Sequence, residues 1–137
     1  MILAKQMHQE SEVHKHQAFN EQKVQRLFQA SITKPEMLYF RLAVKDNEVL
    51  GGFYGMLVEP YFTDVKVAKD FAWFIAPDKR GGILAVRLVR DFEAWAKKHG
   101  ATQLGLGQST GVQVEQTQKL YERLGYRVVG VNTIKDI

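Results

Sequence analysis

The residues with the clearest chemical potential are Arg80, Gly81 and Gly82, which separate an apolar run from a long amphipathic one. The first turn of a helix leaves backbone N–H groups without an intrahelical partner, and the helix dipole adds positive charge at the same end. Two glycines let a ligand approach this backbone closely, and an arginine adds a full positive charge. The stretch therefore predicts a pyrophosphate site, while an ordinary tight strand-to-helix turn is the alternative reading.

Other residue types exclude whole classes of function. The chain has no cysteine, which rules out disulfides, a thiolate nucleophile and a thiolate metal site. His8, His14 and His16 lack an accompanying carboxylate geometry, so we expect exposed histidines and no metal. The 19 Lys and Arg against 15 Asp and Glu give a net charge of +4, which suits a phosphorylated ligand. The basic residues are scattered, so nucleic-acid binding is the weakest reading.

The length of 137 residues predicts one domain, residues 1–137. No apolar run approaches the roughly 18 residues that a membrane span needs, so we expect no membrane partner. The N-terminal residues MILAKQMHQESE lack the apolar region and cleavage site of a signal peptide. We therefore expect a cytoplasmic protein.

Hydrophobic spacing in the N-terminal half predicts two helices and a hairpin. Residues 2–7 have one apolar face and predict a short helix, and Asn20 is a suitable N-cap for a second helix at residues 20–32. Residues 37–62 form two β-rich runs joined at Asp46 and Asn47, which tolerate the positive φ of a tight turn. These runs should pair as an antiparallel hairpin.

The C-terminal half predicts strands and helices in alternation. Residues 67–75 form a third strand that Pro77 ends. Apolar residues then recur at spacings of three and four, which predicts a helix from Gly82 to Gly100. A short strand (residues 102–107), a helix (114–125) and a closing strand (126–134) follow. The predicted order is α-α-β-β-β-α-β-α-β, an α/β (α+β) fold.

Two segments in this order resemble the GNAT N-acetyltransferases. Ile75-Ala76-Pro77 matches the end of a strand in that family, and Arg80 to Ala85 resembles its R/Q-x-x-G-x-G/A loop. The later KLYERLGYRVVG resembles the family's YEKLGF segment. The resemblance covers residues 36–137 and is closest to phage and prophage-like members with an RGG turn. It implies a largely antiparallel sheet, flanked by helices and splayed near the cofactor.

Three features depart from the family pattern. Ile83 stands where the loop usually has its fourth-position glycine, so phosphate contacts could shift by one residue. No strand is apparent before the first helix, and the family's first strand is expected to be missing or very short. Near the last helix, Ser109, Thr110 and Gln113 stand where the family often has an asparagine.

The resemblance implies direct transfer of an acetyl group from acetyl-CoA to an amine, without a metal. In that chemistry Tyr121 would protonate the leaving thiolate. Backbone groups near Phe74 and Ile75 would hold the pantetheine arm and the thioester oxygen. The residues expected to bind coenzyme A are Phe74, Ile75, Arg80, Gly81, Gly82, Ile83, Leu84 and Ala85.

Several assignments stay open in the sequence. Glu10, Glu59 and Asp70 are alternative general bases. Tyr54, Tyr61 and Phe62 are candidates for the wall of an acceptor pocket, although most aromatic residues should fill the core. The acceptor is an unidentified small-molecule or protein amine, and a homodimer is left open. The alternative function is a non-catalytic acyl-CoA-binding or protein-interaction module on the same fold.

Overall fold

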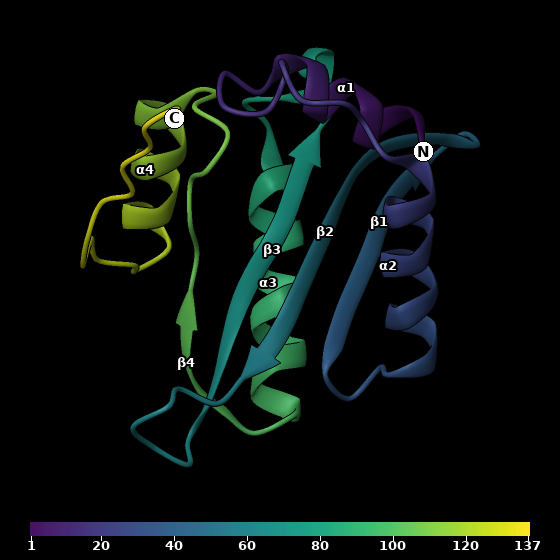
Figure 1. The fold of residues 1–137 in the computed structure, drawn as a ribbon. Helices are drawn as coiled ribbons and strands as arrows, with labels where there is room; N and C mark the ends of the chain where they lie inside the picture. Colours follow the sequence, from purple (N-terminus) through teal and green to yellow (C-terminus); the bar gives the residue numbers. More distant parts are fainter.

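One four-stranded sheet carries the fold, and helices cover both of its faces (Figure 1). The computed structural model describes residues 1–137. Strands β1 and β2 and strands β2 and β3 are antiparallel, whereas β4 pairs in parallel with β3. This arrangement confirms the expected mixed α+β fold. The strands, in order across the sheet, are β1 (Leu38–Lys45), β2 (Glu48–Val58), β3 (Lys66–Ile75) and β4 (Ala101–Gly105).

The first element of the chain is a helix. The helices are α1 (Ile2–Glu10), α2 (Glu21–Thr33), α3 (Ile83–Lys98) and α4 (Val114–Arg123), with a 3₁₀ turn at Pro77–Lys79. Even α3, the longest at 16 residues, is not a candidate membrane span, because no helix combines the required length and apolarity.

Three local sequence signals produce the structures that they predict: a helix cap, a hairpin turn and a helix end. The Asn20 side chain accepts a hydrogen bond of 2.9 Å from the Lys23 N–H and caps α2. Asp46 and Asn47 have φ values of 49° and 61°, so a two-residue turn closes the β1–β2 hairpin. Gly100 follows α3 with φ of 85°, the left-handed geometry that ends many helices.

Neighbouring residues of β1 contact different helices, which places α2 and α3 on opposite faces. Tyr39 lies 5.3 Å from the Phe92 ring of α3, whereas Phe40 stacks on Phe28 of α2 at 4.5 Å. Successive side chains of a strand point to opposite faces, so the sheet separates the two helices. The fully buried Phe92 packs on Phe53 of β2, with ring centroids 4.6 Å apart, and lies at the centre of the core.

The predicted closing strand at residues 126–134 is wrong. Residues 127–137 make no backbone–backbone hydrogen bond, and their valines are exposed. The segment runs beside α4 in Figure 1 instead of along the sheet. Valine favours strands through packing against neighbours, and this preference has no effect where the segment has no ladder partner. Strand β4 is therefore an edge of the sheet.

Strand β4 pairs with only the first part of β3. Their register runs from Lys66–Ala101 to Lys69–Gly105, after which β3 continues alone on this edge. On the other edge, the register with β2 shifts and leaves Phe71 as an extra residue. A β-bulge bends its strand and increases the local twist. The bulge in β3 and the end of its pairing with β4 both fall at Asp70 and Phe71. Strands β3 and β4 diverge from there.

Gly55 of β2 lies directly against the Phe92 ring in the core, where a side chain has no space. A Cβ at Gly55 would overlap the Phe92 ring, which is fixed among other rings. We expect Gly55→Ala to lower the free energy of unfolding by about 1–3 kcal/mol, as overpacking does. Gly105→Ala is the matched control, because a Cβ there meets only Lys69 Cγ at 3.7 Å. Urea denaturation measures both, and equal stability of the two variants would contradict the packing account.

Candidate active site

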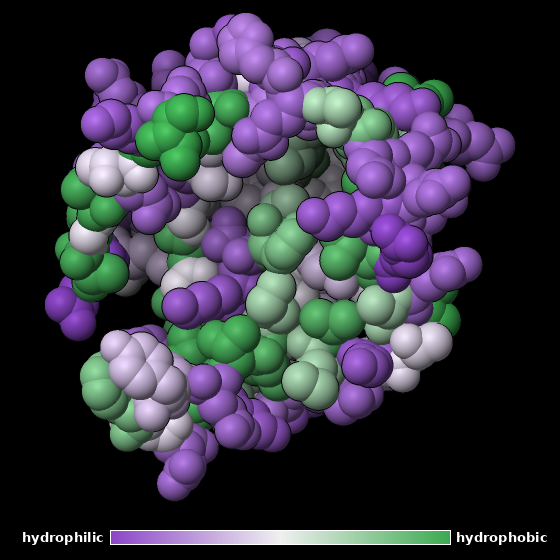
Figure 2. Space-filling view, in the orientation of Figure 1, coloured by the Kyte–Doolittle hydropathy of each residue, from purple (hydrophilic) through white to green (hydrophobic).

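A cleft of about 430 Å³ opens where β3 and β4 diverge. One wall is the second half of β3 (residues 70–75), and the other is the segment after β4 (residues 107–113). The start of α3 lies at one end, α4 contributes Tyr121, and α1 contributes Glu10. Figure 2 shows a hollow in this face of the molecule, bordered by both hydrophobic and hydrophilic side chains.

Two side chains bind Gly107 at the point of divergence, and a third holds one of them. Asp70 Oδ1 accepts a hydrogen bond of 2.9 Å from the Gly107 N–H. The Tyr121 hydroxyl donates to the Gly107 carbonyl at 3.0 Å, and Trp73 Nε1 donates to that hydroxyl, also at 3.0 Å. Both backbone polar groups of Gly107 thus have side-chain partners instead of strand partners. We call this arrangement the Gly107 clasp.

Burial changes the acidity of the two ionisable groups in the clasp. It raises the pKa of Asp70 to about 6, and the hydrogen bond from Gly107 opposes this rise. Burial also raises the pKa of Tyr121 far above its ordinary value, with a further rise from the Asp70 charge. At neutral pH the Asp70 carboxylate therefore predominates and Tyr121 holds its proton. A proton acceptor and a proton donor stand at one end of the cleft.

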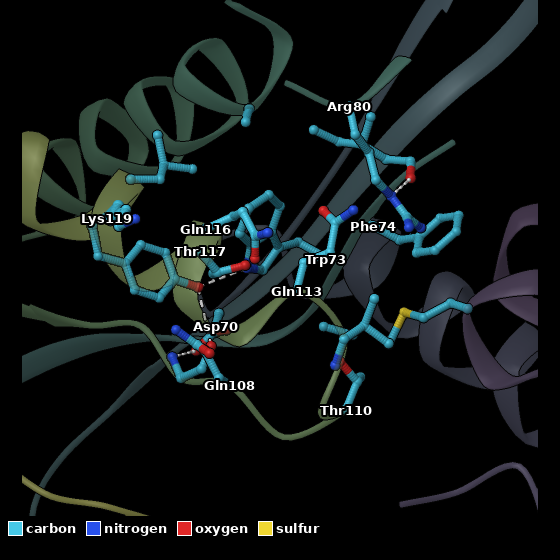
Figure 3. Close-up of a pocket in the computed structure, with 18 of the residues that line it drawn as sticks. Asp70, Trp73, Phe74, Arg80, Gln108, Thr110, Gln113, Gln116, Thr117 and Lys119 are labelled. Carbon is cyan, nitrogen blue, oxygen red and sulfur yellow. Dashed lines mark hydrogen bonds between the residues drawn. The ribbon is translucent and has the colours of Figure 1, made fainter. Parts of the chain in front are cut away.

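Arg80 lines the cleft, but other residues of the chain already contact its guanidinium group. Nε donates to the Ile75 carbonyl at 2.9 Å, and Nη2 forms a partly buried ion pair of 2.6 Å with Glu10 Oε2. The guanidinium carbon lies 4.9 Å from the centre of the Phe74 ring. Arg80 and Phe74 lie together at one end of the cleft, and Asp70 and Gln108 lie at the other (Figure 3).

The turn after Arg80 leaves open space in front of the α3 N-terminus. Gly81 has φ of 80°, Gly82 is the N-cap, and nothing lies within 4 Å of a Cβ built on either residue. The N–H groups of the first helical turn have no intrahelical partner. No other part of the chain therefore blocks the approach of a ligand to this backbone.

Most of the eight residues expected to bind the cofactor line the cleft. Phe74, Ile75, Arg80, Gly81, Gly82 and Ala85 do so. Ile83 and Leu84 do not: the Ile83 side chain is exposed, and Leu84 packs against the core and lines a separate groove beside β1. Only the backbone N–H groups of these two residues, in the first turn of α3, remain available for the predicted role.

A short segment connects the two walls. Glu10 binds Arg80 on the β3 side, and the Glu12 N–H donates to the Thr110 carbonyl at 2.8 Å on the other side. The hydroxyl of Ser11, which is almost fully buried, donates to the same carbonyl at 3.4 Å. The end of α1 therefore links the walls through contacts far apart in sequence, which no local pattern indicates.

The structure separates the alternatives left open by the sequence. Asp70 and Glu10 line the cleft, whereas Glu59 does not. Of the candidates for the wall of an acceptor pocket, none of Tyr54, Tyr61 and Phe62 lines the cleft, while the bulged Phe71 does. No group of three or more His, Cys, Asp or Glu side chains, in the cleft or outside it, is arranged to bind a metal.

Sequence reasoning missed Trp73, Gly107 and Gln108 as parts of this site. Gln108 Oε1 is buried without a hydrogen-bond partner in the chain. One signal was present for the site as a whole, because Asp70 is a charged residue inside an apolar strand. The contacts of Gly107 left no signal, since its partners come from β3 and α4.

Three solved structures with similar folds are informative. An integron cassette protein from the mobile metagenome of Cole Harbour Salt Marsh has a TM-score of 0.77 and 18% identity, with 99% of this chain and 80% of that chain covered. A ribosomal-protein-alanine N-acetyltransferase from Brucella melitensis biovar Abortus 2308 has a TM-score of 0.72 and 15% identity, with 99% of this chain and 89% of that chain covered. The aminoglycoside N-acetyltransferase AAC(6′)-Iy, in complex with the bisubstrate analogue CoA-S-monomethyl-acetylneamine, has a TM-score of 0.66 and 16% identity. The match covers 84% of this chain and 79% of that chain.

These structures share the fold at low sequence identity, and comparison with curated proteins gives no match. The sequence itself matches one family model, the acetyltransferase (GNAT) family, over residues 4–126. That match begins in α1 and ends just after α4, so it contains every strand, the Gly107 clasp and the glycine turn. This chain belongs to the acetyltransferase (GNAT) family.

Proposed function

We propose that the protein transfers an acetyl group from acetyl-CoA directly to an amine. The observation that carries this proposal is the cleft between β3 and β4, which has an open helix N-terminus at one end and Asp70 and Tyr121 at the other. Phosphate groups suit the first end and proton transfer suits the second. The expected likeness to phage members, the cytoplasmic location and the homodimer stay predictions.

Coenzyme A would lie along the cleft. Its pyrophosphate would accept hydrogen bonds from the backbone N–H groups of Gly82, Ile83, Leu84 and Ala85 in the first turn of α3. Its pantetheine arm would follow the β3 edge near Phe74 and Ile75, where β4 no longer pairs with β3. The thioester would then come near Asp70 and Tyr121.

The reaction needs two proton transfers. Asp70 would accept a proton from the attacking amine, and the nitrogen would form a bond to the acetyl carbon as the carbon–sulfur bond breaks. The departing thiolate would take the proton of Tyr121, whose O–H bond would turn from the Gly107 carbonyl towards the sulfur. Passage of the proton from Asp70 to Tyr121 would restore both groups.

One observation favours the alternative of a non-catalytic acyl-CoA-binding module. The Tyr121 hydroxyl already has two partners in the chain, Gly107 and Trp73, which a purely structural tyrosine would also have. Acetyl transfer to any amine distinguishes an enzyme from such a module.

Tyr121→Phe tests the proton donor. If Tyr121 protonates the thiolate, single-turnover acetyl transfer should slow by about 10²- to 10⁴-fold while the affinity for CoA is kept. The defect should shrink in alkaline solution, where the thiolate leaves more readily without a proton. Tyr126→Phe is the control, because its hydroxyl binds Glu93 outside the cleft. A rate within about threefold of the parent at neutral pH would remove Tyr121 from the mechanism.

Asp70→Asn tests the proton acceptor through pH. With Asp70 as base, kcat/KM should rise as the pH increases through about 6, because only the carboxylate accepts a proton. The amide oxygen of the Asp70→Asn variant can still accept the Gly107 hydrogen bond, so the cleft should persist while the inflection disappears and the rate falls by about 10²- to 10⁴-fold. A parent profile without this inflection would exclude Asp70.

The raised pKa of Asp70 should also make the stability of the fold depend on pH. The folded chain holds the Asp70 proton more tightly than the unfolded chain, whose pKa is near its ordinary value. The contribution of Asp70 to the unfolding free energy should therefore fall as the pH rises from about 4 to about 6. Asp70→Asn should remove this part of the pH dependence in urea denaturation.

Glu10→Gln tests the ion pair at the phosphate end. Glu10 places a negative charge beside Arg80, where a phosphate would compete with it. Removal of this charge should tighten CoA binding by about fivefold, equivalent to about 1 kcal/mol. Glu12→Gln is the control, since Glu12 pairs with Lys15 outside the cleft. Unchanged or weaker binding of CoA to the Glu10→Gln variant in calorimetry would show that Glu10 does not compete with the phosphate.

A further inference from the structure

We propose that the acceptor is an amine with one positive charge and a flat apolar group, and that Phe71 recognises this group. The inference rests on the acetyl-transfer function proposed above and names its substrate class. It depends on three features of the cleft: the face that Phe71 occupies, the rigidity of its support and the balance of charges.

The bulge places Phe71 on the α2 face of the sheet. Phe53 and Trp73 are register partners with stacked rings on the α3 face. The next partners, Tyr54 and Ala72, point to the α2 face, and the Phe71 ring lies 5.4 Å from the Tyr54 ring. A group lying against Phe71 therefore sits beside the point where the strands separate. An amine attached to it can reach through the gap towards Asp70.

Phe71 is a supported but accessible aromatic surface. It is 51% exposed, whereas Tyr54 behind it is 5% exposed and donates a hydrogen bond of 3.1 Å to the Leu27 carbonyl in α2. The ring therefore rests on a fixed support and presents its other side to the cleft. Ala72 adds little bulk beside it, which leaves room for a flat apolar group.

The charges of the cleft favour a single ammonium group. The lining contains two carboxylates, Glu10 and Asp70, and three cationic side chains, Arg80, Lys119 and Arg123. Glu10 is already paired with Arg80, so Asp70 alone is available to an ammonium group. The lining holds no further unpaired carboxylate for the additional charges of a polycationic acceptor, and burial of those charges without a partner would oppose binding.

The first experiment compares phenethylamine, methylamine and the polycation neamine as acceptors with acetyl-CoA. We expect kcat/KM to be at least tenfold higher for phenethylamine than for either of the others. Methylamine shares the amine but lacks the apolar group, and neamine carries several charges. Higher kcat/KM for neamine than for phenethylamine would overturn the inference.

Phe71→Ala then identifies the residue. We expect KM for phenethylamine to rise at least tenfold with kcat altered less than threefold, and the loss for methylamine to be much smaller. Phe62→Ala is the matched control, because Phe62 is an exposed phenylalanine that contacts Tyr61 outside the cleft. Ala72→Leu keeps Phe71 and fills the space beside it, so it should also raise KM for phenethylamine. Unchanged KM in both cleft variants would overturn the role of Phe71.

Calorimetry separates this inference from the proposed function. The CoA complex of the parent should bind phenethylamine, and the Phe71→Ala complex should bind it at least tenfold more weakly. If the parent binds no CoA and acetylates no amine, the acetyl-transfer function fails. If CoA binds but phenethylamine binds neither better than methylamine nor more weakly after Phe71→Ala, the substrate class alone is wrong.

Discussion

The cleft depends on the way Gly107 is held after its strand ends. Two parallel strands that separate lose their shared hydrogen bonds, and the freed backbone groups need other partners. Asp70 and Tyr121 supply those partners for Gly107, and Trp73 holds the tyrosine. The bulge at Phe71 bends β3 at the same level. The separation of the strands is thus a satisfied arrangement, and a ligand can lie between them without breaking a ladder.

The clasp also sets the chemistry proposed for the site. Burial of the two side chains that hold Gly107 raises the pKa of Asp70 to about 6 and keeps Tyr121 protonated. Asp70 therefore becomes a better base at neutral pH than an exposed aspartate. The cost falls on Tyr121, whose proton points at a carbonyl and must turn before it can serve a leaving group. The structural contacts and the proposed catalytic role thus compete for this one hydroxyl.

Sequence patterns predicted the features that short-range physics determines. Asn20, the Asp46–Asn47 turn and Gly100 act through their own backbone neighbourhood, and each forms as expected. The Glu10–Arg80 pair joins residues 70 positions apart and left no local signal. The bulge at Phe71 appears only when β2 and β3 are aligned. The prediction of a closing strand was wrong because the valines after Gly125 indicate a preference for strand structure but do not provide a neighbouring strand to pair with.

The central claim is that the cleft between β3 and β4 binds coenzyme A, and the amide signals of its glycines test it most directly. A titration of the labelled protein with CoA, followed in proton–nitrogen correlation spectra, reports Gly81, Gly82 and Gly107 separately. We expect these three signals to shift together and saturate, while Gly130, away from the cleft, stays in place. Signals at Gly81, Gly82 and Gly107 that do not move at millimolar CoA would contradict the account.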